Sequence, residues 1–188
     1  MPAAPQTAAE VARLDNRALQ NLMQDGFAID PAALDDSEYR GISLGLPAAV
    51  VALTWRKFMK TFHREPGTGV LRGWNVRVVQ DGDDTPCVPQ QKGGRERCFG
   101  HYQVVRPIGY AMPTPMYQGL LIDYGLGGNS PLDPVSRTRD PIVALREGRA
   151  DLLLGCSYLD LGFRTLRTPS FFTLERLGPL RRVEPVPG

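Results

Sequence analysis

The first third of the chain carries apolar residues at helical spacing. Over residues 8–24 they fall on one stripe, and Thr7 followed by Glu10 forms the pattern of a capping box. Over residues 48–63, directly after Pro47, a wider apolar face recurs every three or four residues, with basic residues between. We therefore predict two helices, one near the N-terminus and one at 48–63.

From residue 70 onward the apolar period changes to two, which is typical of strands. We predict a short strand at 39–45 and longer strands at 71–80, 97–107, 117–125, 138–148, 150–162 and 170–177. The segment 81–95 is rich in turn-forming residues and predicts a long connection. Connections this short favour antiparallel neighbours, and closing the sheet into a barrel removes its open edges.

Three segments resemble the small lipocalin-like barrels that are known for a GXWXG motif. Residues 41–45, Gly-Ile-Ser-Leu-Gly, are similar to the motif, with Ser43 where it has tryptophan. Residues 53–58, Leu-Thr-Trp-Arg-Lys-Phe, and the closing strand with Phe172 followed by Leu-Glu-Arg at 174–176 are also similar. The resemblance implies a calyx-like barrel around an apolar pocket, and it implies no catalytic residue.

Together these patterns predict a mostly β protein, a lipocalin-like antiparallel barrel with two helices. We expect a single domain over 1–188, with a helical extension at 1–38 and the barrel at 39–183. A basic amphipathic helix at 48–63 can contact a membrane or a partner. Its wide apolar face favours a lid that closes one end of the barrel instead.

Composition excludes several classes of protein. Lys plus Arg is 22 and Asp plus Glu is 20 in 188 residues, a net charge of +2, which argues against a nucleic-acid binder. The sequence has no apolar run of the roughly 18 residues that a membrane span needs. The N-terminus lacks a signal-peptide pattern, and three cysteines without metal-like spacing suit a reducing compartment. We therefore expect a cytoplasmic protein, a monomer or homodimer, without metal or cofactor.

His101 is the first candidate for chemistry, because histidine titrates near neutral pH. Strict alternation places His101 on one face with Phe99 and Gln103, and Tyr102 on the other. If the Phe99 face points inward, His101 can orient a ligand or transfer a proton inside the barrel. If the Tyr102 face points inward, His101 is a surface residue.

Asp123 and Tyr124 form the second candidate pair, within an otherwise apolar strand. Adjacent strand residues face opposite sides, so one of the two points into the barrel. An inward carboxylate can act as a base, and an inward tyrosine can donate a hydrogen bond to a ligand oxygen. The alternative is a core Tyr124 with Asp123 on the surface.

Three further residues match chemical patterns weakly. Ser43 stands in a G-x-S-x-G sequence, the pattern of a nucleophile elbow, but glycines that permit a bend explain it better. His63 suits the C-terminal end of the predicted helix, where a cation is favourable. Cys156 is most simply a small buried residue.

Two functions follow from a barrel with such an interior. The first is binding of a small, largely apolar molecule, with Trp74, Phe99, Gln103 and Phe172 as binding residues. The second is a cofactor-free lyase, isomerase or cyclase, with His101, Asp123 and Tyr124 as acid–base residues. Convergence of His101 and Asp123 inside one pocket would favour the enzyme.

Overall fold

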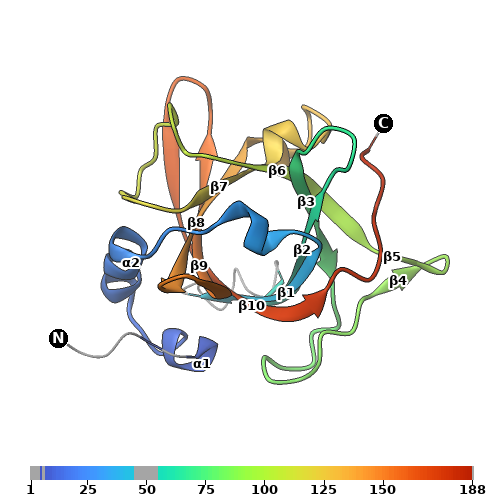
Figure 1. Ribbon diagram of the computed structural model, residues 1–188, viewed down its shortest axis with the longest axis horizontal. Helices are drawn as coiled ribbons and strands as arrows, with labels where there is room; N and C mark the ends of the chain where they lie inside the picture. Colours follow the sequence, from blue (N-terminus) through green and yellow to red (C-terminus); the bar gives the residue numbers. More distant parts are fainter. Residues whose placement is uncertain (1–4, 6, 45–54, 188) are drawn as a thin grey trace.

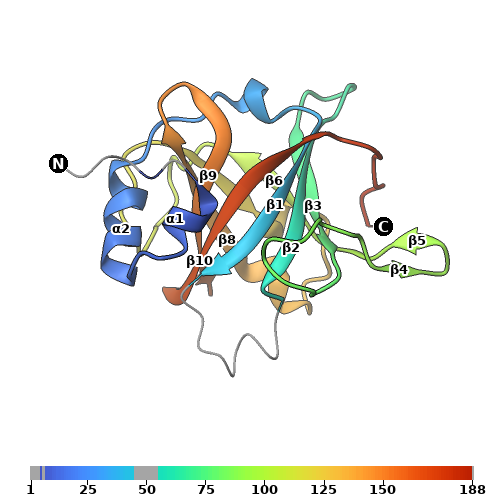
Figure 2. The same cartoon turned by 90° about the horizontal axis from the view of Figure 1, so that it is seen from below.

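The centre of the molecule is a closed antiparallel barrel (Figures 1 and 2). The structure, a computed structural model, describes residue 5, residues 7–44 and residues 55–187. The barrel strands are β1 (Ser37–Leu44), β2 (Lys57–Arg64), β3 (Leu71–Arg77), β6 (Cys98–Val105), β7 (Leu120–Asp123), β8 (Thr138–Arg146), β9 (Arg149–Asp160) and β10 (Thr165–Pro179). They pair in the order β1-β10-β9-β8-β7-β6-β3-β2, which confirms the predicted mostly β barrel.

Two helices and one small hairpin lie outside the barrel. The predicted N-terminal helix is divided into α1 (Ala8–Val11) and α2 (Asn16–Asp25). The capping box is confirmed, since the Glu10 amide donates to the Thr7 hydroxyl at 3.2 Å and the Glu10 carboxylate accepts from the Thr7 amide. Both helices pack against the outer surface of β8 to β10, and the hairpin β4 (Gln91–Lys92) and β5 (Arg95–Glu96) projects from the opposite side (Figure 1).

The prediction of a lid helix at 48–63 is wrong for residues 57–63, which belong to strand β2; residues 48–54 lie outside the described residues. Phe58 and Phe62 are four residues apart, a spacing that places them on one face of a helix and also on one face of a strand. In β2 both rings face the barrel interior, and Lys60 between them faces the same way.

The N-terminal segment covers one end of the barrel. Residues 27–36 cross this end and include the short 3₁₀-helix η1 (Pro31–Leu34), as Figure 1 shows. Ile29 and Leu34 are buried in the interior core, and the Phe27 amide donates to the Ala144 carbonyl at 2.9 Å. This segment therefore closes one end of the barrel, the role that we predicted for the helix at 48–63.

The half of the interior beneath η1 is filled by aromatic and aliphatic side chains. Tyr39 and Phe62 meet edge to face at 5.3 Å between ring centroids, and Phe62 and Tyr102 at 6.0 Å. The buried hydroxyls find backbone partners, since Tyr102 donates to the Thr61 carbonyl at 2.6 Å and Tyr39 to that of Ala150 at 2.6 Å. Side chains therefore fill this end of the barrel.

Outside the barrel wall, a small outer core lies beside β3, separate from the larger cluster beneath α1 and α2. Met59, Trp74, Val76 and Val78 are buried there beneath the 81–90 connection and the C-terminal segment. The predicted alternation of β3 is correct, but its apolar face points outward. Trp74 therefore does not reach the barrel interior, contrary to its expected role in binding a ligand.

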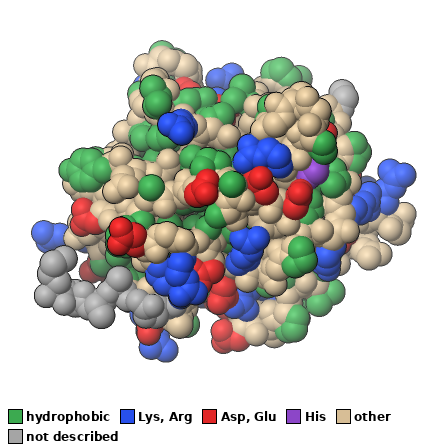
Figure 3. All heavy atoms as spheres, viewed as in Figure 1, with side chains coloured by type: hydrophobic (Ala, Val, Ile, Leu, Met, Phe, Trp, Pro, Cys, Tyr) green, Lys and Arg blue, Asp and Glu red, His purple; other side chains and the backbone are tan. Residues whose placement is uncertain are grey.

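The surface carries no strong electrostatic bias on the face that Figure 3 shows, where acidic and basic side chains are interspersed. This arrangement agrees with the net charge of +2. Within the described residues, none of the helices has the length and apolar character that a membrane crossing requires.

Candidate functional site

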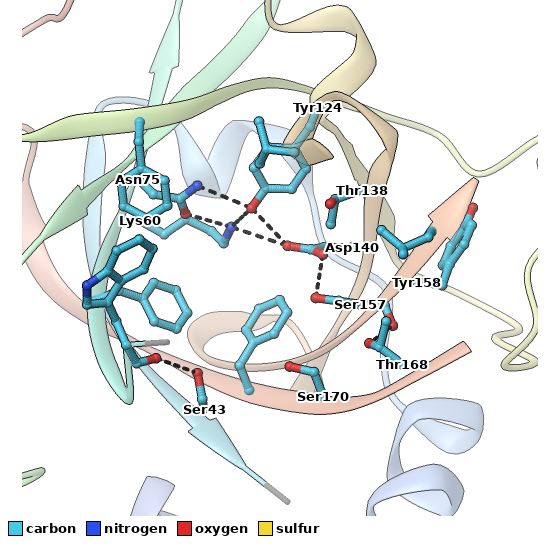
Figure 4. A pocket seen from close by; sticks show the side chains of 16 residues that line it. Ser43, Lys60, Asn75, Tyr124, Thr138, Asp140, Ser157, Tyr158, Thr168 and Ser170 are labelled. Atoms are coloured by element: carbon cyan, nitrogen blue, oxygen red, sulfur yellow. Dashed lines mark hydrogen bonds and ion pairs between the residues drawn. The ribbon is translucent and has the colours of Figure 1, made fainter. Parts of the chain in front are cut away.

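The unfilled half of the barrel contains a cavity of about 380 Å³, at the end opposite η1. Aromatic side chains from three segments form much of its wall, namely those of Trp55, Phe58, Phe99 and Phe172. Figure 4 shows the polar groups gathered on the other side, where hydroxyls of β9 and β10 accompany a lysine, a tyrosine and a carboxylate. A largely apolar cavity with a few convergent polar groups is the usual form of a small-molecule site.

Lys60 is the central polar residue of the cavity. Its Nζ donates to the Tyr124 hydroxyl at 2.5 Å, to Asn75 Oδ1 at 3.0 Å and to Asp140 Oδ2 at 3.4 Å. The Lys60 side chain is only 1% exposed, and that of Asp140 only 4%. A buried ion pair of this kind is retained only when hydrogen bonds satisfy both partners, as they do here.

Four aromatic rings surround the Lys60 ammonium group. Its Nζ lies 4.8 Å from the ring centroid of Tyr102, 5.0 Å from Tyr124, 5.5 Å from Phe172 and 5.7 Å from Phe58. Burial among these rings lowers the pKa of Lys60, because the charged form loses its hydration, while the nearby Asp140 carboxylate acts in the opposite direction. The cavity thus holds an amine that gives up its proton more readily than a surface lysine.

Tyr124 connects the lysine to the carboxylate. Its hydroxyl accepts from Lys60 and donates to Asp140 Oδ2 at 3.0 Å, and the second carboxylate oxygen accepts from Ser157 at 2.7 Å. Burial raises the pKa of Tyr124 well above its ordinary value, and the Asp140 charge adds to this effect. Tyr124 therefore remains protonated near neutral pH and acts as a hydrogen-bond donor.

Asn75 is held in one orientation by the backbone of β6. Its Nδ2 donates to the Gly100 carbonyl at 3.1 Å and to the Tyr124 hydroxyl at 3.3 Å, so its Oδ1 is left to accept from Lys60. Gly100 has φ +54°, and the pairing register between β3 and β6 shifts at this point. This is a β-bulge, in which an extra residue interrupts the ladder.

The bulge explains why His101 and Gln103 lie outside the cavity, contrary to the prediction from strict alternation. Phe99 pairs with Asn75 and Tyr102 with Gly73, so the Phe99 and Tyr102 side chains both point inward. His101 is buried on the outer side of the barrel wall beside Trp74, with 6.2 Å between ring centroids, and on the same side Gln103 donates to the Leu126 carbonyl. Burial lowers the pKa of His101.

Asp123 also lies outside the cavity, in a structural role. Its carboxylate pairs with Arg139 Nε at 3.0 Å, accepts from the Tyr110 hydroxyl at 2.8 Å and caps the 3₁₀-helix η2 (Tyr124–Leu126) through the Gly125 amide. Of the predicted acid–base residues, only Tyr124 lines the cavity. Phe99 and Phe172 of the predicted binding residues line it as well.

The weaker candidates do not form a catalytic group. Ser43 lies within β1 and donates to the Trp55 carbonyl at 3.2 Å, so its strand position differs from that of a nucleophile elbow. His63 pairs with Asp36 at 2.6 Å at the end of β2, rather than at a helix terminus. Cys156 is buried, as expected, and burial raises its pKa to about 12.

Sequence reasoning missed Lys60, Asn75 and Asp140. The helix predicted at 48–63 places Lys60 among the basic residues between its apolar positions, and the strand predicted at 71–80 places Asn75 on the face opposite Trp74. Asp140 had a usable signal, because alternation in β8 places it on the same face as Ile142 and Ala144, both fully buried.

Comparison of the chain with protein-family models, with curated proteins and with solved structures found no match. Among residues 7–44 and 55–187, no three His, Cys, Asp or Glu side chains lie close enough together to hold one metal ion. The function is therefore inferred from the geometry of the cavity itself.

Proposed function

We propose that this protein binds a small, largely apolar molecule in the barrel cavity. The observation that carries the proposal is the aromatic-walled space of about 380 Å³, which has one buried polar cluster formed by Lys60, Tyr124 and Asp140. The volume falls within the range of about 300–1,000 Å³ typical of small-molecule sites. The resemblance to small lipocalin-like barrels supports the same function.

The charges of the cluster favour a ligand without net charge. Lys60 and Asp140 have opposite charges, and the other described residues that line the cavity are uncharged. Within this cluster a buried anion or cation would therefore find no spare counter-charge, which is costly in a low-dielectric interior. We propose a ligand with an apolar body and one neutral oxygen group, which binds in the cytoplasm to a monomer or homodimer.

Tryptophan fluorescence provides the test, because the two tryptophans of the chain report on different places. Trp55 lines the cavity, whereas Trp74 lies in the outer core. Naphthalene methanol, an apolar body with one hydroxyl, should quench the emission of the Trp74→Phe chain, in which Trp55 is the single tryptophan. The matched Trp55→Phe chain should respond weakly. Equal responses, or none in either chain, would exclude binding in this cavity.

The alternative of a cofactor-free acid–base enzyme is supported by one observation. A lysine with a lowered pKa and a protonated tyrosine converge on the same cavity, as a base and a hydrogen-bond donor would. Such a site would exchange the protons next to a carbonyl group. Deuterium uptake by naphthyl methyl ketone in heavy water, followed by NMR, tests this, and Tyr124→Phe should slow it by about 10²–10⁴. A rate no faster than in buffer would exclude the enzyme.

A further inference from the structure

We propose that Lys60 captures a carbonyl compound, an aldehyde or ketone with an apolar body, as a covalent imine inside the barrel. The inference rests on the proposed binding function and specifies the chemical class of its ligand. It depends on the position of the Lys60 amine at the cavity wall, among rings and beside one carboxylate.

Lys60 is the only one of the three lysines in the sequence that lines the cavity. Lys57 is on the outer face of β2, where its Nζ donates to Asp81 at 2.6 Å. Lys92 is exposed in β4, outside the barrel. A carbonyl compound that enters the cavity therefore meets a single lysine amine.

The reaction is balanced without any co-reactant. The aldehyde R–CHO and the Lys60 ammonium R′–NH₃⁺ give the iminium R–CH=NH⁺–R′ and water. The carbon–oxygen double bond breaks, a carbon–nitrogen double bond forms, and the oxygen leaves with two of the ammonium hydrogens. One positive charge is present before and after the reaction, so the buried ion pair with Asp140 is preserved.

The neighbours of Lys60 suit each stage of this reaction. Attack on the carbonyl carbon requires the unprotonated amine, and the lowered pKa of Lys60 increases its fraction. Asp140, 3.4 Å from Nζ, can hold the proton that the ammonium releases and pass it to the oxygen that leaves as water. Asp140 is then a carboxylate again and is the counter-ion of the iminium. Tyr124, 2.5 Å from Nζ, can donate a hydrogen bond to the oxygen that leaves as water.

The aromatic surroundings favour the product over free ammonium. An iminium that carries an apolar group buries more apolar surface than the free lysine, and the rings at 4.8–5.7 Å provide contacts for it. An alcohol of the same shape can fill the cavity but cannot react. This difference separates the covalent proposal from simple binding.

Reductive trapping tests the proposal on the full chain. The protein is incubated with naphthalene carbaldehyde and sodium cyanoborohydride, which reduces the imine to a stable secondary amine, and the labelled peptides are mapped by mass spectrometry. We expect Lys60 to be labelled at least about tenfold faster than Lys92, because the cavity holds the aldehyde next to the Lys60 amine. The lowered pKa of Lys60 acts in the same direction. Naphthalene methanol in excess should protect Lys60 and leave Lys92 unaffected.

The possible outcomes separate the two proposals. Quenching of Trp55 by the alcohol, with no preference of the aldehyde for Lys60, would overturn the imine and leave the binding function standing. Absence of both would overturn both. Lys60→Met should abolish the cavity label, and Lys92→Met, the matched control, should retain it. Because the mapping uses the unaltered chain, it gives a decision even where Lys60→Met does not fold.

Discussion

Replacing Lys60 by Met is expected to cost a large part of the stability of the fold. Met fills much of the space of the lysine stem, but the Asp140 carboxylate loses the cation that lies 3.4 Å away. The hydroxyls of Tyr124 and Ser157 then remain as its donors. Breaking a buried pair from one side costs about 3–5 kcal/mol, against total stabilities of about 5–15 kcal/mol.

Removing both charges should restore most of this loss. In the Lys60→Met, Asp140→Asn chain no charge is left unpaired, and the asparagine can still accept from Tyr124. A neutral replacement of a buried pair is often close to wild type in stability. We therefore expect the double variant to be more stable than Lys60→Met by about 2–4 kcal/mol.

Urea unfolding, followed by tryptophan fluorescence, measures both effects. With a slope of about 2 kcal/mol per M, a loss of 4 kcal/mol lowers the midpoint by about 2 M. Lys92→Met is the control, since Lys92 is exposed and its loss should change stability by less than about 0.5 kcal/mol. A Lys60→Met midpoint within error of the control, or a double variant weaker than Lys60→Met, would refute the buried pair.

The remaining predictions concern pH, a close backbone contact and the thiols. Burial lowers the pKa of Lys60 below the ordinary value near 10.4, so the unfolded chain binds this proton more tightly than the folded chain does. The free energy of unfolding should therefore rise with pH between the folded and the unfolded pKa. The Lys60→Met, Asp140→Asn chain should lack this contribution in urea titrations at pH 7–9.5. Gly73→Ala places a Cβ 2.0 Å from a carbonyl oxygen and should lower stability by about 1–3 kcal/mol, whereas Gly67→Ala, with open space around it, should not. All three thiols should react with Ellman's reagent in denaturant without reductant, and one stable disulfide would contradict this. In the native protein Cys156 should react last, because it is buried whereas Cys87 and Cys98 are partly exposed.

Much of the barrel could be predicted because strand alternation and turns are local properties. The hairpin of β8 and β9 and the closing strand β10 lie close to their predicted positions. The sequence of residues 48–63 alone could not distinguish a helix from a strand, because Phe58 and Phe62 satisfy both periods. Only pairing with the neighbouring strands β1 and β3 decides between them. Because β2 was predicted as part of a helix, Lys60 was predicted outside the barrel interior, where it in fact lies.

The candidate site was harder to predict, for two physical reasons. The apolar face of β3 is buried outside the barrel, so a buried tryptophan at position 74 did not indicate the interior. The bulge at Gly100 allows Phe99 and Tyr102 to share the interior, which no rule of simple alternation allows. Tyr124 and Phe172 follow simple alternation, because Tyr124 shares the interior with Ile122 and Phe172 shares it with Leu174.

The bulge at Gly100 also lets the backbone fix one polar contact of the cavity, the one between Asn75 and Lys60. By turning a main-chain carbonyl toward Asn75, it presents a group that can only accept, so the amide nitrogen must face it and the amide oxygen must face Lys60. The backbone conformation at Gly100 thus determines that the Asn75 amide presents its oxygen to Lys60. Substitutions that keep the backbone conformation at Gly100 keep this orientation of the Asn75 amide. A change of that conformation would reverse the amide, although no residue of the cavity wall is replaced.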